Sequence, residues 1–208
     1  MLGIVVTGGQ APSLGIIKNE LDDADMIVAA DSGLDTLLSY GYEPDLIVGD
    51  MDSISNRKIL EKFHRSKILL YPEDKDYTDT ELAINHLYEK GCTSVVVIGG
   101  GGGRLDHLIA IYSLFFRERA PVRWITDNEK IFLVKGSFCI NLKINTVISL
   151  FPVTGQLCSM TSSGLKWPLD ELEWNPGDGG ISNVSSERTV KIDMKSGKLV
   201  MIIPLDDN

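Results

Sequence analysis

Apolar and polar positions follow two different patterns along the chain, and the change comes near residue 126. Before that point, short β-branched runs alternate with longer segments in which apolar residues recur at helical spacing. The expected strands are residues 2–7, 26–29, 46–48, 67–71, 94–98 and 122–126. The expected helices are residues 34–40, 54–63, 78–90 and 105–118. This alternation predicts a mostly parallel sheet with helices on both faces.

The clearest of these helices is expected over residues 78–90. Its apolar positions, among them Leu82 and Leu87, are interleaved with polar ones. Thr78 lies three positions before Glu81, which is the spacing of an N-terminal capping box. The sequence therefore predicts that Thr78 caps this helix.

After residue 126 the apolar runs are short and are separated by Gly, Asn and Ser, which is typical of antiparallel β structure. The runs are residues 130–134, 138–142, 146–151, 156–161, 189–194 and 199–203. We therefore expect an α/β fold with two domains. Residues 1–126 form an N-terminal, mostly parallel α/β sandwich, and residues 127–208 form a small antiparallel β-sandwich.

Composition narrows the functional class. The chain has 208 residues, of which 43% are hydrophobic and 24% charged, as in an ordinary globular protein. The net charge of −9 argues against nucleic acid as a partner, because a nucleic-acid binder needs a basic surface. Membrane association is not expected, since no apolar run approaches the roughly 20 residues of a membrane-spanning helix. The three cysteines are far apart in the sequence, which favours a reducing cytoplasm.

Aspartates recur where the expected strands end, at Asp31, Asp50, Asp52, Asp79 and Asp106. The carboxyl ends of parallel strands meet at one edge of a sheet, so these side chains are expected to gather there. An extended backbone would place Asp50 and Asp52 on the same side. Clustered carboxylates repel one another, and a hard divalent cation relieves that repulsion. One such aspartate alone is more often a cap or turn residue, but together they favour magnesium-assisted phosphoryl transfer.

The glycine run Gly99–Gly103 is followed by Arg104. It matches neither a Walker loop nor a dinucleotide fingerprint. Two interpretations remain open: a flexible turn, or a loop whose backbone N–H groups face phosphate with Arg104 beside it. Gly8-Gly9, after the first strand, is a second turn of this kind.

Taken in order, the motifs resemble those of the thiamine pyrophosphokinase family, from the first strand almost to the C-terminus. The motifs are Ala30-Asp31-Ser32-Gly33, Pro44–Ser53 with its Gly-Asp-Met-Asp-Ser block, Asp76-Tyr77-Thr78-Asp79, Gly103-Arg104-Leu105-Asp106-His107, Gly164–Leu169 and Ser182-Asn183. The resemblance implies an enzyme that transfers pyrophosphate from ATP to the hydroxyl of thiamine, giving thiamine diphosphate and AMP. It also implies a homodimer with sites at the subunit interface, in which residues 1–126 bind ATP and metal and residues 127–208 bind thiamine and dimerise.

The resemblance also implies roles for the acidic residues. Asp50, Asp52 and Asp79 would hold Mg²⁺ and the phosphates of ATP, with Asp31 close by. Asp106 would lie near thiamine, as an acceptor or a base for its hydroxyl. All four of Asp50, Asp52, Asp79 and Asp106 are therefore expected to be catalytic.

Further roles follow from the same resemblance. Thr78 would contact phosphate, and Arg104 the nucleotide. Ser182 and Asn183 would bind the aminopyrimidine of thiamine. Trp167 would stack on this cationic, aromatic substrate from the partner subunit, which suits an indole ring.

Lys75 departs from the family pattern, since some members carry Gln there. Two roles stay open for it: contact with a phosphate, or an ion pair with Asp74. Two alternative functions also remain. One is phosphoryl or pyrophosphoryl transfer to another small alcohol, such as a pterin. The other is a non-catalytic sensor of thiamine diphosphate or a nucleotide.

Overall fold

The structure is a computed structural model that describes residues 1–205. The chain forms two compact units, the first from Met1 to Asn128 and the second beginning at Glu129. Within residues 1–205, no helix is long and apolar enough to span a membrane.

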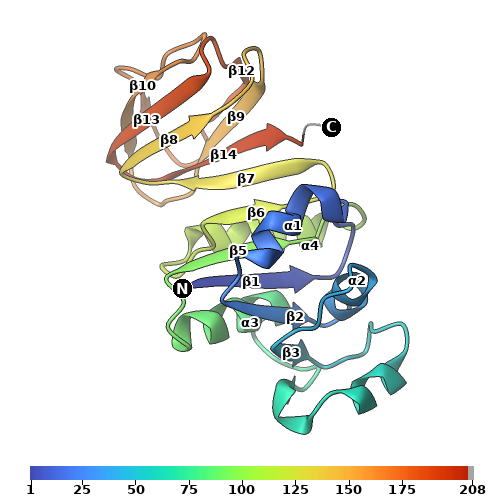
Figure 1. The fold of residues 1–208 in the computed structure, drawn as a ribbon. Coiled ribbons are helices and arrows are strands. Elements are labelled where there is room, and N and C mark those ends of the chain that lie inside the picture. The colour runs from blue at the N-terminus through green and yellow to red at the C-terminus, as the bar shows by residue number, and fades with distance from the viewer. Residues whose placement is uncertain (206–208) are drawn as a thin grey trace. The chain divides into compact units, whose positions relative to one another are not determined.

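The first unit is built on a parallel sheet with the strand order β6-β5-β1-β2-β3-β4 (Figure 1). The strands are β1 (Leu2–Thr7), β2 (Met26–Ala30), β3 (Leu46–Gly49), β4 (Ile68–Leu70), β5 (Ser94–Ile98) and β6 (Arg123–Ile125). In β1, β2 and β5 every residue after the first is buried. Burial of both faces explains why these strands are continuous apolar runs rather than alternating ones.

Helices connect these strands and cover the sheet; Figure 1 draws α1 in front of it and α3 behind it. The α-helices are α1 (Leu14–Asp22), α2 (Gly33–Ser39), α3 (Asp79–Glu89) and α4 (Leu105–Ser113), and the 3₁₀ helices are η1 (Arg57–Lys62), η2 (Arg65–Lys67) and η3 (Leu114–Phe116). After β4 the chain returns through α3 to β5, which pairs with β1. The strand order therefore reverses between β1 and β5, and in open α/β sheets ligands bind beyond the carboxyl ends of the strands at such a point.

Most of the predicted elements of this unit are confirmed, with two differences. The predicted helix at 54–63 is wrong: the segment forms the 3₁₀ helix η1, capped by Asn56. Ile54 is buried before η1 begins, and within η1 only Ile59 and Leu60 pack, partly exposed, against the core. This apolar anchor is too small to stabilise a longer α-helix. Helix α1 was not predicted, because only Ile17 and Leu21 are buried and two apolar positions make a weak periodic signal.

The second unit is a β-sandwich of two antiparallel sheets, ordered β12-β9-β14-β7 and β11-β10-β13-β8. The strands are β7 (Glu129–Val134), β8 (Ser137–Asn141), β9 (Val147–Pro152), β10 (Cys158–Ser163), β11 (Glu173–Trp174), β12 (Gly180–Val184), β13 (Thr189–Ser196) and β14 (Leu199–Pro204). Side chains of both sheets share one buried core that includes Leu150, Met160 and Ile192. The predicted fold class is confirmed, although β11 and β12 were not anticipated.

Candidate active site

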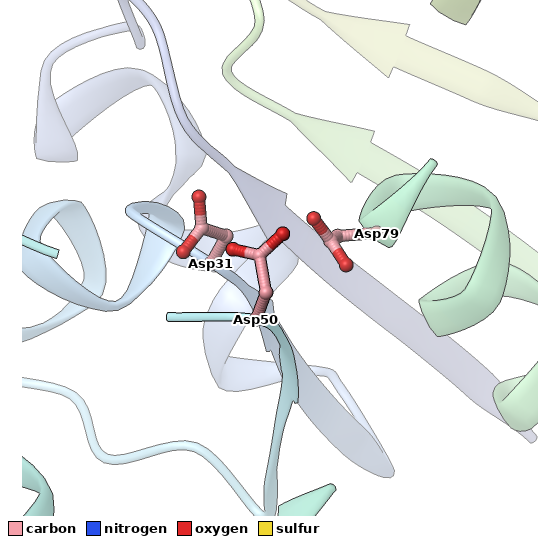
Figure 2. Close-up of side chains that lie close together, drawn as sticks. All are labelled: Asp31, Asp50 and Asp79. Carbon is pink, nitrogen blue, oxygen red and sulfur yellow. The ribbon is translucent and has the colours of Figure 1, made fainter. Parts of the chain in front are cut away.

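Three aspartates from separate elements meet at the carboxyl edge of the parallel sheet. Asp31 follows β2, Asp50 follows β3, and Asp79 is the first residue of α3. Each offers a carboxylate oxygen that lies within 4.8 Å of those of the other two. Figure 2 shows the three carboxyl groups facing one another. We call Asp31, Asp50 and Asp79 the three-aspartate group.

The backbone around this group adopts conformations that bring the carboxylates together. Asp31 has a φ of 48°, in the left-handed region that few non-glycine residues adopt. Gly49 has a φ of 145°. A Cβ atom on Gly49 would lie 3.2 Å from Asp31 Cβ and 3.2 Å from Asp79 Cγ. Glycine is therefore needed at the end of β3 for the other two aspartates to approach so closely.

The carboxylates of this group have few hydrogen-bond donors. The Ser53 hydroxyl donates to Asp31 Oδ2. Lys75 Nζ lies 3.1 Å from Asp50 Oδ2, where it donates a hydrogen bond, and 3.1 Å from Asp79 Oδ1. The contact with Asp79 is close enough for an ion pair but lacks hydrogen-bond geometry, since Asp79 Oδ1 accepts no hydrogen bond from residues 1–205. Asp31 Oδ1 is likewise buried without a donor in that range.

Burial and neighbouring groups shift the pKa values of Asp79 and Asp50 in opposite directions. Burial raises the pKa of Asp79 above its usual value, although Lys75 opposes the effect. The pKa of Asp50 is lowered, first by the backbone N–H of Asp52 and then by Lys75. Buried carboxylate oxygens without donors suit a hard divalent cation, which prefers oxygen ligands. The residues present therefore fit a magnesium site.

Asp52 lies outside the three-aspartate group. The expected extended backbone over residues 50–52 is wrong, because Met51 has a φ of 64° and the chain turns there. The Asp52 N–H donates to Asp50 Oδ1 at 3.1 Å, which closes this turn. The Asp52 side chain is exposed, and hydrogen bonding and charge from Asp50 raise its pKa. A direct role of Asp52 with metal stays a prediction.

A cleft of about 620 Å³ adjoins this group where the strand order reverses. It is lined by Thr7, Gly8, Gly9, Gln10, Ala30, Asp31, Ser32, Ser53, Thr78, Asp79, Thr80, Gly100, Gly101, Gly102, Gly103, Arg104, His107, Ala110 and Ile111. The structure thus brings together four predicted residues, Asp31, Thr78, Asp79 and Arg104. Ser53 appeared in the sequence only as the end of the Gly-Asp-Met-Asp-Ser motif, and Gln10 had no signal there. The contacts of Ser53 with Asp31 and of Gln10 with Gly101 join segments that are distant in the chain.

The glycine run is held in place rather than free. Gln10 N–H donates to Gly101 O at 2.7 Å, and Gly101 N–H donates back to Gln10 O at 2.9 Å. The Trp124 indole donates to Gly99 O at 2.7 Å. Gly102 has a φ of 60°, in the left-handed region that favours glycine, and a Cβ atom there would also displace the Gln10 side chain. The interpretation as a flexible turn is therefore less favoured than that of a shaped loop.

Arg104 and Asp106 form an ion pair at the start of α4. Arg104 Nε donates to Asp106 Oδ1 at 3.1 Å, and the second nitrogen contacts Oδ2. Both side chains are exposed, at 74% and 58%. The Arg104 guanidinium lowers the pKa of Asp106, so the Asp106 carboxylate is a weaker base than a free one.

The remaining predicted residues lie in the second unit. Asn183 is buried, and its side chain binds the backbone of Trp167: Oδ1 accepts from Trp167 N at 3.2 Å and Nδ2 donates to Trp167 O at 2.8 Å. Trp167 is 51% exposed, with Lys166 Nζ 4.5 Å from its ring centroid. Ser182 is exposed, with a φ of 61°, at an irregularity in β12. In this structure Asn183 positions the tryptophan, while Ser182 and Trp167 are open to solvent.

Comparisons with known proteins identify the family to which the chain is similar. The family "Thiamin pyrophosphokinase, catalytic domain" matches residues 17–125, and "Thiamin pyrophosphokinase, vitamin B1 binding domain" matches residues 138–199. The chain is 28% identical to thiamine pyrophosphokinase of Bacillus subtilis over 210 residues, covering 97% of this chain and 98% of the relative. It is also 28% identical to thiamin pyrophosphokinase 1 of Caenorhabditis elegans, covering 91% and 83%.

Solved structures give the same result. The B. subtilis thiamine pyrophosphokinase superimposes with a TM-score of 0.81 at 26% identity, covering 99% of this chain and 100% of that one. Thiamin pyrophosphokinase of Candida albicans has the same fold, with a TM-score of 0.76 at 24% identity, covering 99% and 90%. Since the catalytic-domain match alone spans more than half of the sequence, the chain belongs to the thiamine pyrophosphokinase family and is an enzyme of that family.

Proposed function

We propose that the protein transfers the pyrophosphoryl group of ATP to the hydroxyl of thiamine with the help of Mg²⁺, giving thiamine diphosphate and AMP. The observation that carries the proposal is the convergence of Asp31, Asp50 and Asp79 beside a cleft of about 620 Å³. Carboxylates at the edge of a nucleotide-sized cleft suit a metal-assisted phosphoryl-transfer site. Membership of the family supports thiamine as the acceptor.

ATP would occupy this cleft. The turns at Gly8-Gly9 and Gly100–Gly103 bring backbone close to it without side chains in the way. The N–H groups of Gly100 and Gly101 already donate to Gly8 O and Gln10 O. Backbone donors to phosphate would therefore come from Gly9, Gly102 and Gly103, and Arg104 would add a charge-assisted donor. Thr78 lines the same cleft at the N-terminus of α3, where the helix dipole favours negative charge.

Magnesium would be held by Asp31, Asp50 and Asp79, with Asp52 as a further predicted ligand. When bound, the ion would neutralise phosphate charge during transfer. The protein itself supplies the fixed geometry: Gly49 leaves room for the carboxylates, and Ser53 orients Asp31.

Thiamine would be bound by residues of the second unit. The exposed Trp167 ring would stack on the cationic acceptor, and the Ser182 hydroxyl would bind its aminopyrimidine. Asn183 would support this site by holding the Trp167 backbone. We further propose a cytoplasmic homodimer with sites at the subunit interface, in which Asp106 accepts a hydrogen bond from the thiamine hydroxyl.

A direct assay tests the proposal. The protein is incubated with ATP, Mg²⁺ and thiamine, and AMP and thiamine diphosphate are separated by chromatography. We expect both products, and their loss on chelation of the metal. The variant Asp50→Asn should reduce turnover by about 100-fold or more, whereas Asp23→Asn, exposed at the end of α1, should not.

Other outcomes identify the alternatives. AMP formation with a different alcohol, but none with thiamine, would support a pyrophosphokinase of other specificity. Binding of thiamine diphosphate without any turnover would support a sensor. Normal turnover in Asp50→Asn would contradict the role of the three-aspartate group.

A further inference from the structure

Lys75 occupies a position beside the three-aspartate group that none of the roles above explains. Its side chain is only 13% exposed. The ammonium donates to Asp50 Oδ2 and to the backbone oxygen of Pro72, each at 3.1 Å, and lies 3.1 Å from Asp79 Oδ1. A partly buried lysine thus bridges two of the three carboxylates that would bind the metal.

This ammonium and a divalent cation compete for the same oxygens. Two cations a few ångströms apart in a partly buried site repel much more strongly than they do in water. The metal also needs the carboxylate lone pairs to which Lys75 now donates. Occupation of the group by metal and the present position of Lys75 therefore oppose each other.

Lys75 satisfies only part of the hydrogen-bonding capacity and charge of the three-aspartate group. Asp79 Oδ1 lies near the ammonium but accepts no hydrogen bond, and Asp31 Oδ1 is buried without a donor among residues 1–205. With all three carboxyl groups ionised the group carries three negative charges, of which Lys75 compensates one. Two remain, which is the charge of a single divalent ion. Lysine is a point charge on a flexible stem, so it can leave without rearrangement of the backbone.

We propose that Lys75 is an internal counter-cation of the three-aspartate group, which gives up its carboxylate contacts when a divalent metal binds and thereby weakens metal binding in the absence of nucleotide. This inference rests on the proposed metal site. Lys75 would not contact the metal itself; it would affect metal binding indirectly, by occupying the carboxylates of Asp50 and Asp79.

Metal affinity without substrates tests the proposal. Binding of Mg²⁺ and Mn²⁺ is measured by calorimetry on the whole protein, with no nucleotide or thiamine present. Lys75→Gln should bind either ion about tenfold more tightly or better, because a positive charge near the metal is removed. Lys75→Arg keeps the charge and should bind no more tightly than the natural protein.

Lys18→Gln is the matched control, since it removes a lysine that is paired with Asp22 on exposed α1. It changes the net charge equally and should leave metal affinity unchanged. An unchanged or weaker affinity in Lys75→Gln overturns the proposal and leaves the metal site standing. If the natural protein and Lys75→Gln both fail to bind metal, the metal site and the proposal fall together.

A second measurement uses the natural protein and does not depend on a variant that folds. The reactivity of Lys75 toward an acylating reagent is followed by peptide mass spectrometry, with Lys18 as the internal reference. Saturating Mg²⁺ should increase acylation of Lys75 several-fold relative to Lys18, because the ammonium has left its carboxylate partners. No increase at saturating metal overturns the proposal.

Discussion

At the scale of single residues, the site depends on Gly49, which carries no functional group. Its φ of 145° strains any other residue, and a Cβ atom 3.2 Å from Asp31 Cβ and Asp79 Cγ would force these side chains to shift. We expect Gly49→Ala to push these carboxylates apart and to weaken Mn²⁺ binding by about 10- to 100-fold. Strain at such a position should also cost about 1–3 kcal/mol of stability. Calorimetry and chemical denaturation measure the two effects.

Gly155→Ala is the control for this prediction, because a Cβ atom there would meet nothing within 4 Å. It should leave metal binding and stability nearly unchanged. A Gly49→Ala protein that binds Mn²⁺ as tightly as the natural one would show that the three aspartates need not approach as closely as they do here.

The sequence predicted part of this residue-scale geometry. The aspartates at strand ends could be anticipated, since parallel strands deliver their carboxyl ends to one edge. That Asp31, and not Asp52, joins the three-aspartate group could not be anticipated, because it depends on the left-handed backbone at Asp31 and Met51. The sequence did not indicate that Lys75 bridges Asp50 and Asp79. Asp79 is only four residues from Lys75, but the contact with Asp50 forms only when two loops 25 residues apart fold together.

At the scale of elements, helix α3 supplies Asp79, and its first turn depends on Thr78. The predicted cap is confirmed: Thr78 Oγ1 accepts from Glu81 N–H at 3.2 Å. The Glu81 half of the predicted capping box is not formed among residues 1–205, because the Glu81 carboxylate contacts Arg117 at 3.1 Å instead of the Thr78 N–H. The helix also buries Ala83, Ile84 and Leu87, so its later turns do not depend on the cap.

We expect Thr78→Ala to reduce the stability of the ligand-free protein by about 1 kcal/mol, whereas Thr78→Ser should keep the cap and most of the stability. Fraying of the first turn should also displace Asp79 and weaken metal binding in the alanine variant only. Urea denaturation and Mn²⁺ calorimetry test both points. Equal stability of the two variants would mean that the hydrogen bond to Glu81 N–H contributes little.

Elements with strong patterns were the ones that the sequence predicted well. Strands β1 and β5 match their predicted bounds because they are buried apolar runs with clear ends. Strand β11 has only two residues, and β12 is irregular between Gly180 and Asn183. Neither carries the alternation that marks a strand, and their pairing depends on tertiary contacts.

At the scale of the whole molecule, the two units are proposed to divide the substrates between them. The cleft beside the three-aspartate group belongs entirely to the first unit, and Trp167, Ser182 and Asn183 belong to the second. Hydrogen exchange can test this division on the intact protein, because binding slows exchange in the segments that must open to release a ligand.

We expect Mg²⁺ with a non-hydrolysable ATP analogue to slow exchange in the loops that follow β1, β2, β3 and β5. At about 100 times the dissociation constant, the stabilisation is about 2.7 kcal/mol, which corresponds to exchange slowed by about 100-fold in segments that open only when the ligand leaves. Thiamine added afterwards should slow exchange at residues 164–169 and 180–184. If saturating Mg²⁺ and analogue instead protect residues 164–184 and leave the loop after β5 unchanged, the nucleotide does not bind in the cleft. The roles of the two units would then have to be reassigned.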